Sequence, residues 1–108
     1  MPSPSVEKDL YCLIGRDVSE SPSPSMMNAA FSELSIDAQY VAMSLDEGAL
    51  EDRFTELKGG RLSGMNITIP FKSSIIPLLD GLDALSARIG AVNTVKKEGK
   101  RFIGHNTD

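Results

Sequence analysis

The sequence predicts a three-layer α/β domain whose sheet is mostly parallel and ends in an antiparallel hairpin. Two observations carry this prediction. Short apolar runs alternate along the chain with segments whose apolar residues recur at helical spacing. Such alternation places helices on the faces of a parallel sheet. Near the end, two strand-like runs flank a glycine-containing turn, which predicts a β-hairpin.

The chain is expected to begin with a flexible N-terminal tail at 1–8, followed by one domain at 9–108. A buried strand is predicted at Asp9–Gly15, because a short apolar run stops there at a glycine. The segment 16–25 is rich in serine and proline, so it is expected to be a loop.

Two helices and a strand are predicted next. The first helix is expected to begin after Ser25, which has the chemistry of an N-cap. A strand follows at 38–45, and Ser44 and Glu47 have the spacing of a capping box that opens the second helix. The glycine pair at 59–60 is expected to end it. The apolar positions at helical spacing are Met26, Met27, Ala30, Phe31 and Leu34, then Leu50, Phe54 and Leu57.

The last part of the chain is predicted to hold a third strand, two short helical segments and the hairpin. The third strand is rich in β-branched residues and ends at a proline. The predicted segments are a strand at 65–70, helices at 73–79 and 83–88, and hairpin strands at 91–97 and 101–106 around a turn at 98–100.

The composition is that of an ordinary globular domain and excludes several classes of protein. Of the 108 residues, 41% are hydrophobic and 24% are charged, and this length suits one domain. The net charge of −4 disfavours nonspecific nucleic-acid binding, which requires a basic surface. No apolar run approaches the roughly 20 residues of a membrane span. The first residues lack the basic and apolar regions of a signal peptide.

The single cysteine and the single histidine indicate neither a disulfide nor a metal site. Cys12 lies in an apolar run and is expected to be a buried core residue. One cysteine forms no internal disulfide, so no oxidising compartment is needed and we expect a cytoplasmic protein. His105 has no neighbours in the pattern of a metal motif, so it is expected at the surface or at a strand end.

The first candidate binding segment is the serine loop. Ligands of an α/β sheet bind beyond the carboxyl ends of its strands, and this loop follows the first strand. Ser21 and Ser23 are each followed by proline, which stiffens the backbone and holds two hydroxyls in place. Such a pair suits a carboxylate or a polyol. The alternative is a rigid connector whose serines are merely solvated.

The second candidate is the segment that leaves the third strand. Pro70 ends the strand ladder and Lys72 follows two positions later. Lysine suits proton transfer because its proton affinity responds to burial and to neighbouring charge. Asn66 and Thr68 are expected to share a face of the strand that leads to this lysine. The alternative is a solvated lysine at the start of a loop.

The third candidate is a set of polar residues in the two arms of the hairpin. Asparagine offers both a donor and an acceptor, and can therefore distinguish hydroxyl positions on a sugar-like ring. The alternative is ordinary turn and strand-end chemistry. The residues are Asn93, Thr94, Asn106, Thr107 and Asp108.

These segments together resemble the N-terminal, substrate-binding domain of the shikimate dehydrogenase family. The resemblance extends from about Tyr11 to Asp108 and is carried by four motifs in order, SPSPSMMNAAF, GMNITIPFK, IGAVNTV and GHNTD. Each motif alone is weak, whereas the ordered set is specific. Two departures stand out, since Glu20 takes a position that is histidine in many members and Met27 stands before Asn28.

The resemblance implies an enzyme of two α/β domains, of which the second is a Rossmann domain for NADP that is absent from this chain. It implies that Lys72 is the acid/base and that Asp108 pairs with it at the reacting hydroxyl. The implied substrate-binding residues are Ser21 and Ser23 for the carboxylate, Asn93 for ring hydroxyls, and Asn66, Thr68, Lys72 and Asp108.

The implied activity is the reversible, NADP-dependent reduction of 3-dehydroshikimate to shikimate, in the route to chorismate and the aromatic amino acids. This chain alone is expected to bind its small-molecule substrate weakly and not to turn over, because hydride transfer needs the cofactor. Three alternatives stay open. They are a quinate or quinate/shikimate dehydrogenase, which the added charge of Glu20 allows, a non-catalytic sensor, and a plain structural domain.

Overall fold

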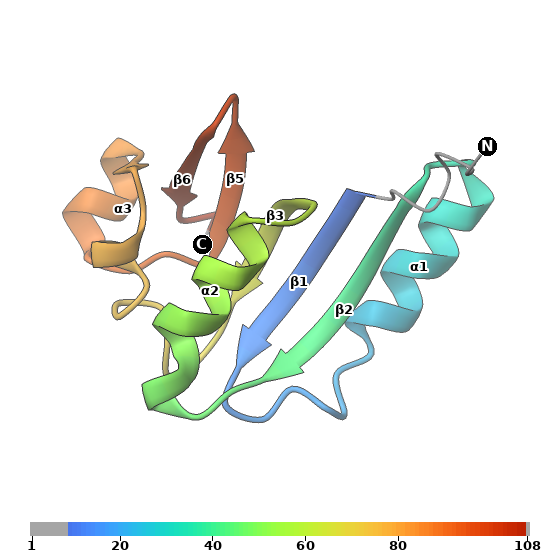
Figure 1. The fold of residues 1–108 in the computed structure, drawn as a ribbon, viewed down its shortest axis with the longest axis horizontal. Helices are drawn as coiled ribbons and strands as arrows, with labels where there is room; N and C mark the ends of the chain where they lie inside the picture. The colour runs from blue at the N-terminus through green and yellow to red at the C-terminus, as the bar shows by residue number, and fades with distance from the viewer. Residues whose placement is uncertain (1–8, 108) are drawn as a thin grey trace.

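The computed structural model describes residues 9–107 and shows one six-stranded sheet between helices (Figure 1). The predicted tail at 1–8 and Asp108 lie outside the described residues. The strands are β1 (Asp9–Gly15), β2 (Ala38–Ser44), β3 (Leu62–Ile67), β4 (Gly81–Leu82), β5 (Thr94–Glu98) and β6 (Arg101–His105). The helices are α1 (Ser23–Glu33), α2 (Leu50–Lys58) and α3 (Ala84–Ile89), with 3-10 turns η2 (Glu47–Ala49) and η3 (Ile76–Leu78).

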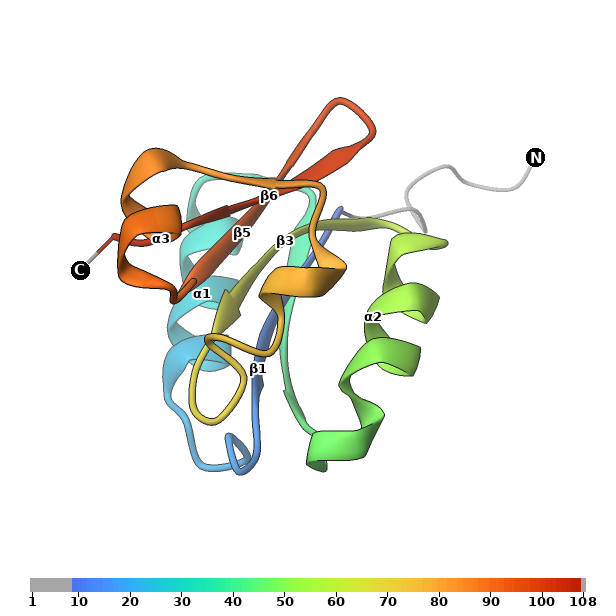
Figure 2. The same cartoon turned by 90° about the vertical axis from the view of Figure 1, so that its left-hand side faces the viewer.

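The sheet topology confirms the predicted fold class. The strand order is β2-β1-β3-β5-β6-β4, and β1 runs parallel to both β2 and β3. Strand β5 is antiparallel to β3 and to β6, so β6 points the same way as β3. Figure 2 shows α1 and α2 on opposite faces of the sheet, which makes three layers. The carboxyl ends of β1, β2, β3 and β6 therefore meet at one edge.

The hydrophobic core lies on the α2 face of the sheet. Cys12 and Ile14 of β1 and Met65 and Ile67 of β3 belong to it, and Cys12 is fully buried there, as predicted. Burial raises the pKa of its thiol to about 11, which keeps the group protonated and unreactive. Phe54 of α2 packs edge-on against Phe102 of β6, with ring centroids 5.7 Å apart.

Helix α1 covers the opposite face of the sheet more loosely. None of its residues is buried, Met26 is 66% exposed, and Leu34, the C-cap residue that follows the helix, is 68% exposed. Its main ring contact joins Phe31 to Tyr11 of β1, with centroids 5.8 Å apart. The predicted helix is confirmed, but its apolar positions do not form a core stripe.

The predicted start of α1 was wrong, because the helix begins at Ser23 and its N-cap is Pro22 rather than Ser25. Pro24 fits in the first turn, where its missing N–H has no intrahelical partner to lose. The helix is instead fixed by Asn28, whose amide pairs with both backbone groups of Tyr40 at 2.8 and 2.9 Å. It thereby satisfies backbone groups on the outer side of β2, the edge strand.

The predicted capping box was also wrong. Asp46 is the N-cap of η2, and α2 begins only at Leu50. The Ser44 hydroxyl instead accepts a hydrogen bond of 3.0 Å from the N–H of Val18. This side chain therefore holds the loop after β1 and leaves Glu47 without its predicted partner.

Two other predicted boundaries differ from the structure, each next to a proline. Strand β3 ends at Ile67 rather than at Pro70, because the chain already turns at Thr68, whose carbonyl accepts a hydrogen bond of 3.0 Å from the N–H of Phe71. The helix predicted at 73–79 is only the 3-10 turn η3, which contains Pro77. The short strand β4 was missed, since two residues carry no periodic signal.

The second short helix and the hairpin are confirmed within a few residues. Asp83 caps α3 by accepting a bond of 2.8 Å from the N–H of Ser86, and Gly90 ends the helix with φ of 77°. Ser86, followed by His105, holds the pKa of Asp83 below its ordinary value. The Ser86 hydroxyl has no hydrogen-bond partner within the described residues. We therefore attribute the effect of Ser86 on the Asp83 pKa to the hydrogen bond from its backbone N–H.

Acid should weaken the wild-type fold more than it weakens the Asp83→Asn variant. Folding lowers the pKa of Asp83, so its contribution is complete above the unfolded value of about 3.9 and is lost as pH falls through the folded value. Urea midpoints measured above and below about pH 4 test this. Exposed Asp37→Asn is the control and should follow the wild type. Equal acid sensitivity in the wild type and Asp83→Asn would contradict the capping role.

Candidate functional site

Three of the sequence-predicted segments gather at the carboxyl edge of the sheet. Figure 2 shows the loop after β1 and the loop after β3 side by side at the lower end of the domain. Asn93, just before β5, connects the hairpin to this edge. Its N–H donates to the carbonyl of His105 at 3.0 Å, and its carbonyl accepts a hydrogen bond from the N–H of Ile67 at 2.8 Å. Because β6 runs in the same direction as β3, the residues after β6 lie at this edge as well.

The serine loop is held by its own hydrogen bonds. Ser21 donates its N–H to the Val18 carbonyl at 3.1 Å, and its hydroxyl oxygen accepts from the N–H of Ser23 at 3.1 Å. The Ser21 hydroxyl is thereby positioned while its own proton stays available for a ligand. Both serines are half-buried, so they are neither core residues nor fully solvated.

The loops after β1 and β3 are joined directly to each other. Thr68 donates its N–H to the Ile14 carbonyl at 2.9 Å, and Arg16 donates its N–H to the Ile69 carbonyl at 3.2 Å. Gly15 lies between these two bonds, and a Cβ there would come within 2.5 Å of the Thr68 methyl carbon. The absence of a side chain at Gly15 therefore allows Thr68 to approach β1.

Lys72 is anchored by the backbone on both sides. Phe71 is buried in the core, and the Lys72 carbonyl accepts a hydrogen bond of 2.8 Å from the N–H of Val92. The lysine side chain is half-buried. The backbone at Lys72 is thus fixed between the β3 loop and the segment that enters β5.

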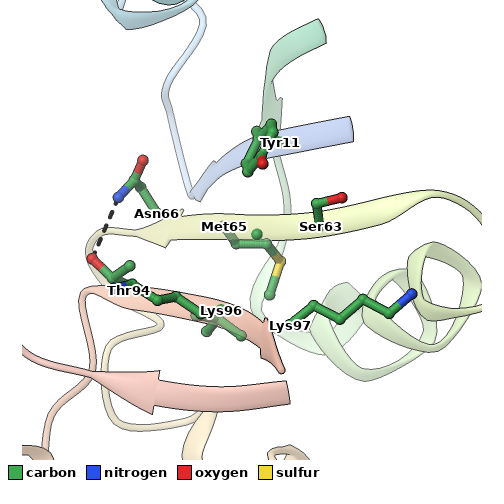
Figure 3. A pocket seen from close by; sticks show the side chains of 9 residues that line it. Tyr11, Ser63, Met65, Asn66, Thr94, Lys96 and Lys97 are labelled. Carbon is green, nitrogen blue, oxygen red and sulfur yellow. Dashed lines mark hydrogen bonds between the residues drawn. The ribbon is translucent and has the colours of Figure 1, made fainter. Parts of the chain in front are cut away.

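A chain of side-chain hydrogen bonds crosses the sheet to the hairpin. The Tyr40 hydroxyl donates to Asn66 Oδ1 at 2.9 Å, and Asn66 Nδ2 donates to Thr94 Oγ1 at 3.5 Å (Figure 3). The Thr94 hydroxyl donates to Asn93 Oδ1 at 3.0 Å. The same oxygen accepts from the N–H and the hydroxyl of Thr107 at 3.1 and 3.3 Å. Two of the predicted site residues, Asn66 and Asn93, are therefore connected.

Sequence reasoning missed Tyr40. It is 4% exposed, and burial, followed by the neighbouring Cys12, raises the pKa of its hydroxyl. A tyrosine in a β-strand is ordinary core chemistry, so nothing in the sequence shows that its hydroxyl reaches Asn66 two strands away. The sequence analysis noted Asn28 only as a neighbour of Met27. Its structural role is to hydrogen-bond to the backbone of Tyr40 in β2, which the sequence does not reveal.

Two residues near the hairpin have structural partners. His105 places its ring nitrogens 3.2 Å from Asp83 Oδ2 and 3.2 Å from Glu98 Oε2, so it lies at a strand end between two carboxylates. Within residues 9–107 no group of three or more His, Cys, Asp or Glu side chains is arranged to hold a metal ion. Asn106 is buried and donates to the Ala91 carbonyl at 3.1 Å.

One hollow lies at this edge of the sheet and a second lies on the face of the sheet. One of about 270 Å³ lies between the two loops, and its lining includes Thr68. The other, of about 370 Å³, lies along β3 and β5 and shares Asn66 and Thr94 with the hydrogen-bond chain (Figure 3). Neither is lined by the serine pair or Lys72, so the site is defined by the convergence of polar groups rather than by either hollow.

The helices within residues 9–107 are too short and too polar to cross a bilayer.

Comparison with known proteins matches this domain to one family. The model of the shikimate dehydrogenase substrate binding domain matches residues 13–95. A curated relative from Bacillus subtilis, shikimate dehydrogenase (NADP(+)), is 40% identical over 101 residues, which cover 94% of this chain and 36% of the relative. The chain thus spans just over a third of the length of that protein.

Solved structures of the same family share the fold. Shikimate dehydrogenase from Aquifex aeolicus superposes with a TM-score of 0.88 at 38% identity, covering 99% of this chain and 40% of that one. Shikimate 5-dehydrogenase from Listeria monocytogenes, solved with shikimate and NAD, gives a TM-score of 0.89 at 35% identity, covering 94% of this chain and 35% of that one.

Replacing Gly15 by alanine should disturb the junction between the two loops. The added Cβ would lie 2.5 Å from Thr68 and 2.7 Å from Val18 side-chain carbons, so overpacking should lower the free energy of unfolding by about 1–3 kcal/mol. Urea unfolding measures this, and the Thr68 methyl resonance should also shift. Gly48→Ala is the control, because nothing lies within 4 Å of its Cβ position. A Gly15→Ala variant as stable as Gly48→Ala would contradict the close approach.

Proposed function

This chain belongs to the shikimate dehydrogenase family as its substrate-binding domain, and on that premise we propose that it binds shikimate and 3-dehydroshikimate at the carboxyl edge of its sheet. The observation that carries the proposal is the convergence of three polar segments at this edge. They are the loop with Ser21 and Ser23, the turn from Thr68 to Lys72, and the amide chain that ends at Asn93.

The proposed roles follow from the chemistry of each group. The Ser21 and Ser23 hydroxyls bind the substrate carboxylate, since the Ser21 oxygen accepts from Ser23 N–H and keeps its own proton to donate. Asn66, Thr68 and Asn93 contact the ring hydroxyls, because amides and hydroxyls supply both donors and acceptors.

Lys72 is the proposed acid/base at the reacting oxygen. In reduction, the substrate ketone carbon gains a hydride and its oxygen gains a proton from the ammonium group of Lys72. In oxidation, the neutral amine accepts that proton. Asp108 lies outside the described residues, and we propose that its carboxylate pairs with Lys72 and favours the ammonium form.

In the reduction, the hydride comes from the reduced form of NADP, the cofactor in the names of the curated relatives. The described residues do not fit that cofactor. Dinucleotide binding uses a glycine-rich turn between a strand and a helix, whereas residues 16–22, which join β1 to α1, contain no glycine. We therefore expect this chain alone to bind substrate without turnover. We also propose a cytoplasmic protein, because its single, buried cysteine needs no oxidising compartment.

The test is a titration of the chain with shikimate, followed by amide NMR shifts, with quinate in parallel. A site on one domain should bind weakly, with Kd on the order of millimolar. Shifts should cluster at the serine loop, Lys72 and Asn93. Stronger binding of quinate would favour a quinate enzyme instead, since exposed Glu20 adds charge beside Ser21.

The Lys72→Met variant should weaken shikimate binding by about tenfold or more, because a charge-assisted hydrogen bond is lost while the side-chain stem is kept. Lys100→Met is the matched control in the exposed hairpin turn and should bind like the wild type. An absence of shikimate shifts in the wild type at tens of millimolar, or equal binding by both lysine variants, would contradict the proposed site.

A further inference from the structure

The direction of each hydrogen bond around Asn93 is determined by one backbone group. The N–H of Thr107 can only donate, so the atom of Asn93 that it meets at 3.1 Å must be the acceptor Oδ1. The Asn93 amide therefore has only one orientation that satisfies this contact. Its NH2 group points away from Thr107, and it makes no hydrogen bond within residues 9–107.

The same reasoning fixes the direction of the hydrogen bonds between Thr94 and Asn66 and between Asn66 and Tyr40. The Thr94 hydroxyl gives its proton to Asn93 Oδ1, so towards Asn66 it can only accept. Asn66 must then turn its Nδ2 to Thr94, at 3.5 Å, and its Oδ1 to Tyr40. The Tyr40 hydroxyl completes the series as a donor at 2.9 Å, and burial raises its pKa, so it keeps the proton that this bond needs.

We propose that Thr107 sets the orientation of the Asn93 amide and that Tyr40, Asn66 and Thr94 form a one-way hydrogen-bond relay that holds the amide in that position, so that Asn93 presents its NH2 group and selects a ligand oxygen that accepts hydrogen bonds. This inference rests on the proposed function, because it assigns a polarity to one contact of the same site. Tyr40 and Thr94 act through Asn93 and are positioning residues.

The relay depends on the Thr94 hydroxyl, which is both the acceptor from Asn66 and the donor to Asn93. Valine has nearly the shape of threonine but has neither function. Serine keeps the hydroxyl and loses only a methyl group. These two variants therefore separate the hydrogen bond from the packing of the side chain.

The experiment compares wild type, Thr94→Val and Thr94→Ser by shikimate titration and by the side-chain NH2 resonances of Asn93. Thr94→Val should weaken binding about 3- to 10-fold and shift the Asn93 NH2 resonances of the free protein. Thr94→Ser should stay within about twofold of the wild type. Thr55→Val, an exposed position on α2, is the matched control for the change of residue type and should match the wild type.

Tyr40→Phe tests the far end of the relay in the same assay. It removes only the donor to Asn66, so it should reduce affinity in the same direction as Thr94→Val and also shift the Asn93 NH2 resonances of the free protein, which a change confined to Asn66 would leave in place. Tyr11→Phe is its control, because Tyr11 lies on the neighbouring strand and no hydrogen bond of its hydroxyl occurs within the described residues.

The outcomes distinguish the relay from the proposed function. If wild type binds shikimate and Thr94→Val binds equally well, or if the valine and serine variants weaken binding equally, the relay is wrong. If the wild type does not bind shikimate, the proposed function fails. The Asn93 NH2 resonances then decide the relay, which requires a shift in Thr94→Val that Thr94→Ser does not show.

Discussion

The site depends first on the pair of backbone hydrogen bonds that join the ends of β1 and β3. Thr68 N–H to Ile14 and Arg16 N–H to Ile69 tie two loops together just beyond the sheet, and Gly15 allows the contact because it has no side chain. The serine loop and the turn that carries Lys72 would otherwise leave the sheet independently. Because these bonds use the backbone, the loop side chains stay available for a ligand.

The two faces of the sheet serve different purposes. The α2 face holds the apolar core, including Cys12 and Phe54, and stabilises the fold by burial. The α1 face is loosely covered, and there Tyr40 reaches Asn66 and connects the edge strand to the hairpin. The apolar core does not occupy the α1 face, so polar side chains on that face can form hydrogen bonds with one another. At the end of this series, Asn93 uses its Oδ1, and its NH2 group stays available for a ligand.

Most of the fold could be predicted from the sequence, because it depends on local patterns. The run at Asp9–Gly15, the glycine turn of the hairpin and the alternation of strands and helices each act over a few residues. The failures were long-range or steric. Ser44 and Ser25 have the chemistry of caps, but Ser44 bonds to Val18 from a distant loop and Pro22 takes the place of Ser25. The contact from Tyr40 to Asn66 depends on strand order, which no local pattern encodes.

A crystal structure of this chain soaked with shikimate would test the central claim most directly. The account predicts the ring at the carboxyl edge of the sheet, with its carboxylate on the Ser21 and Ser23 hydroxyls, one hydroxyl at Lys72 Nζ, and another oxygen facing Asn93 Nδ2. A ligand bound instead in the hollow along β3 and β5, away from Lys72, would contradict it. So would a ligand oxygen that donates to Asn93 Oδ1, because that atom is already committed to Thr94 and Thr107.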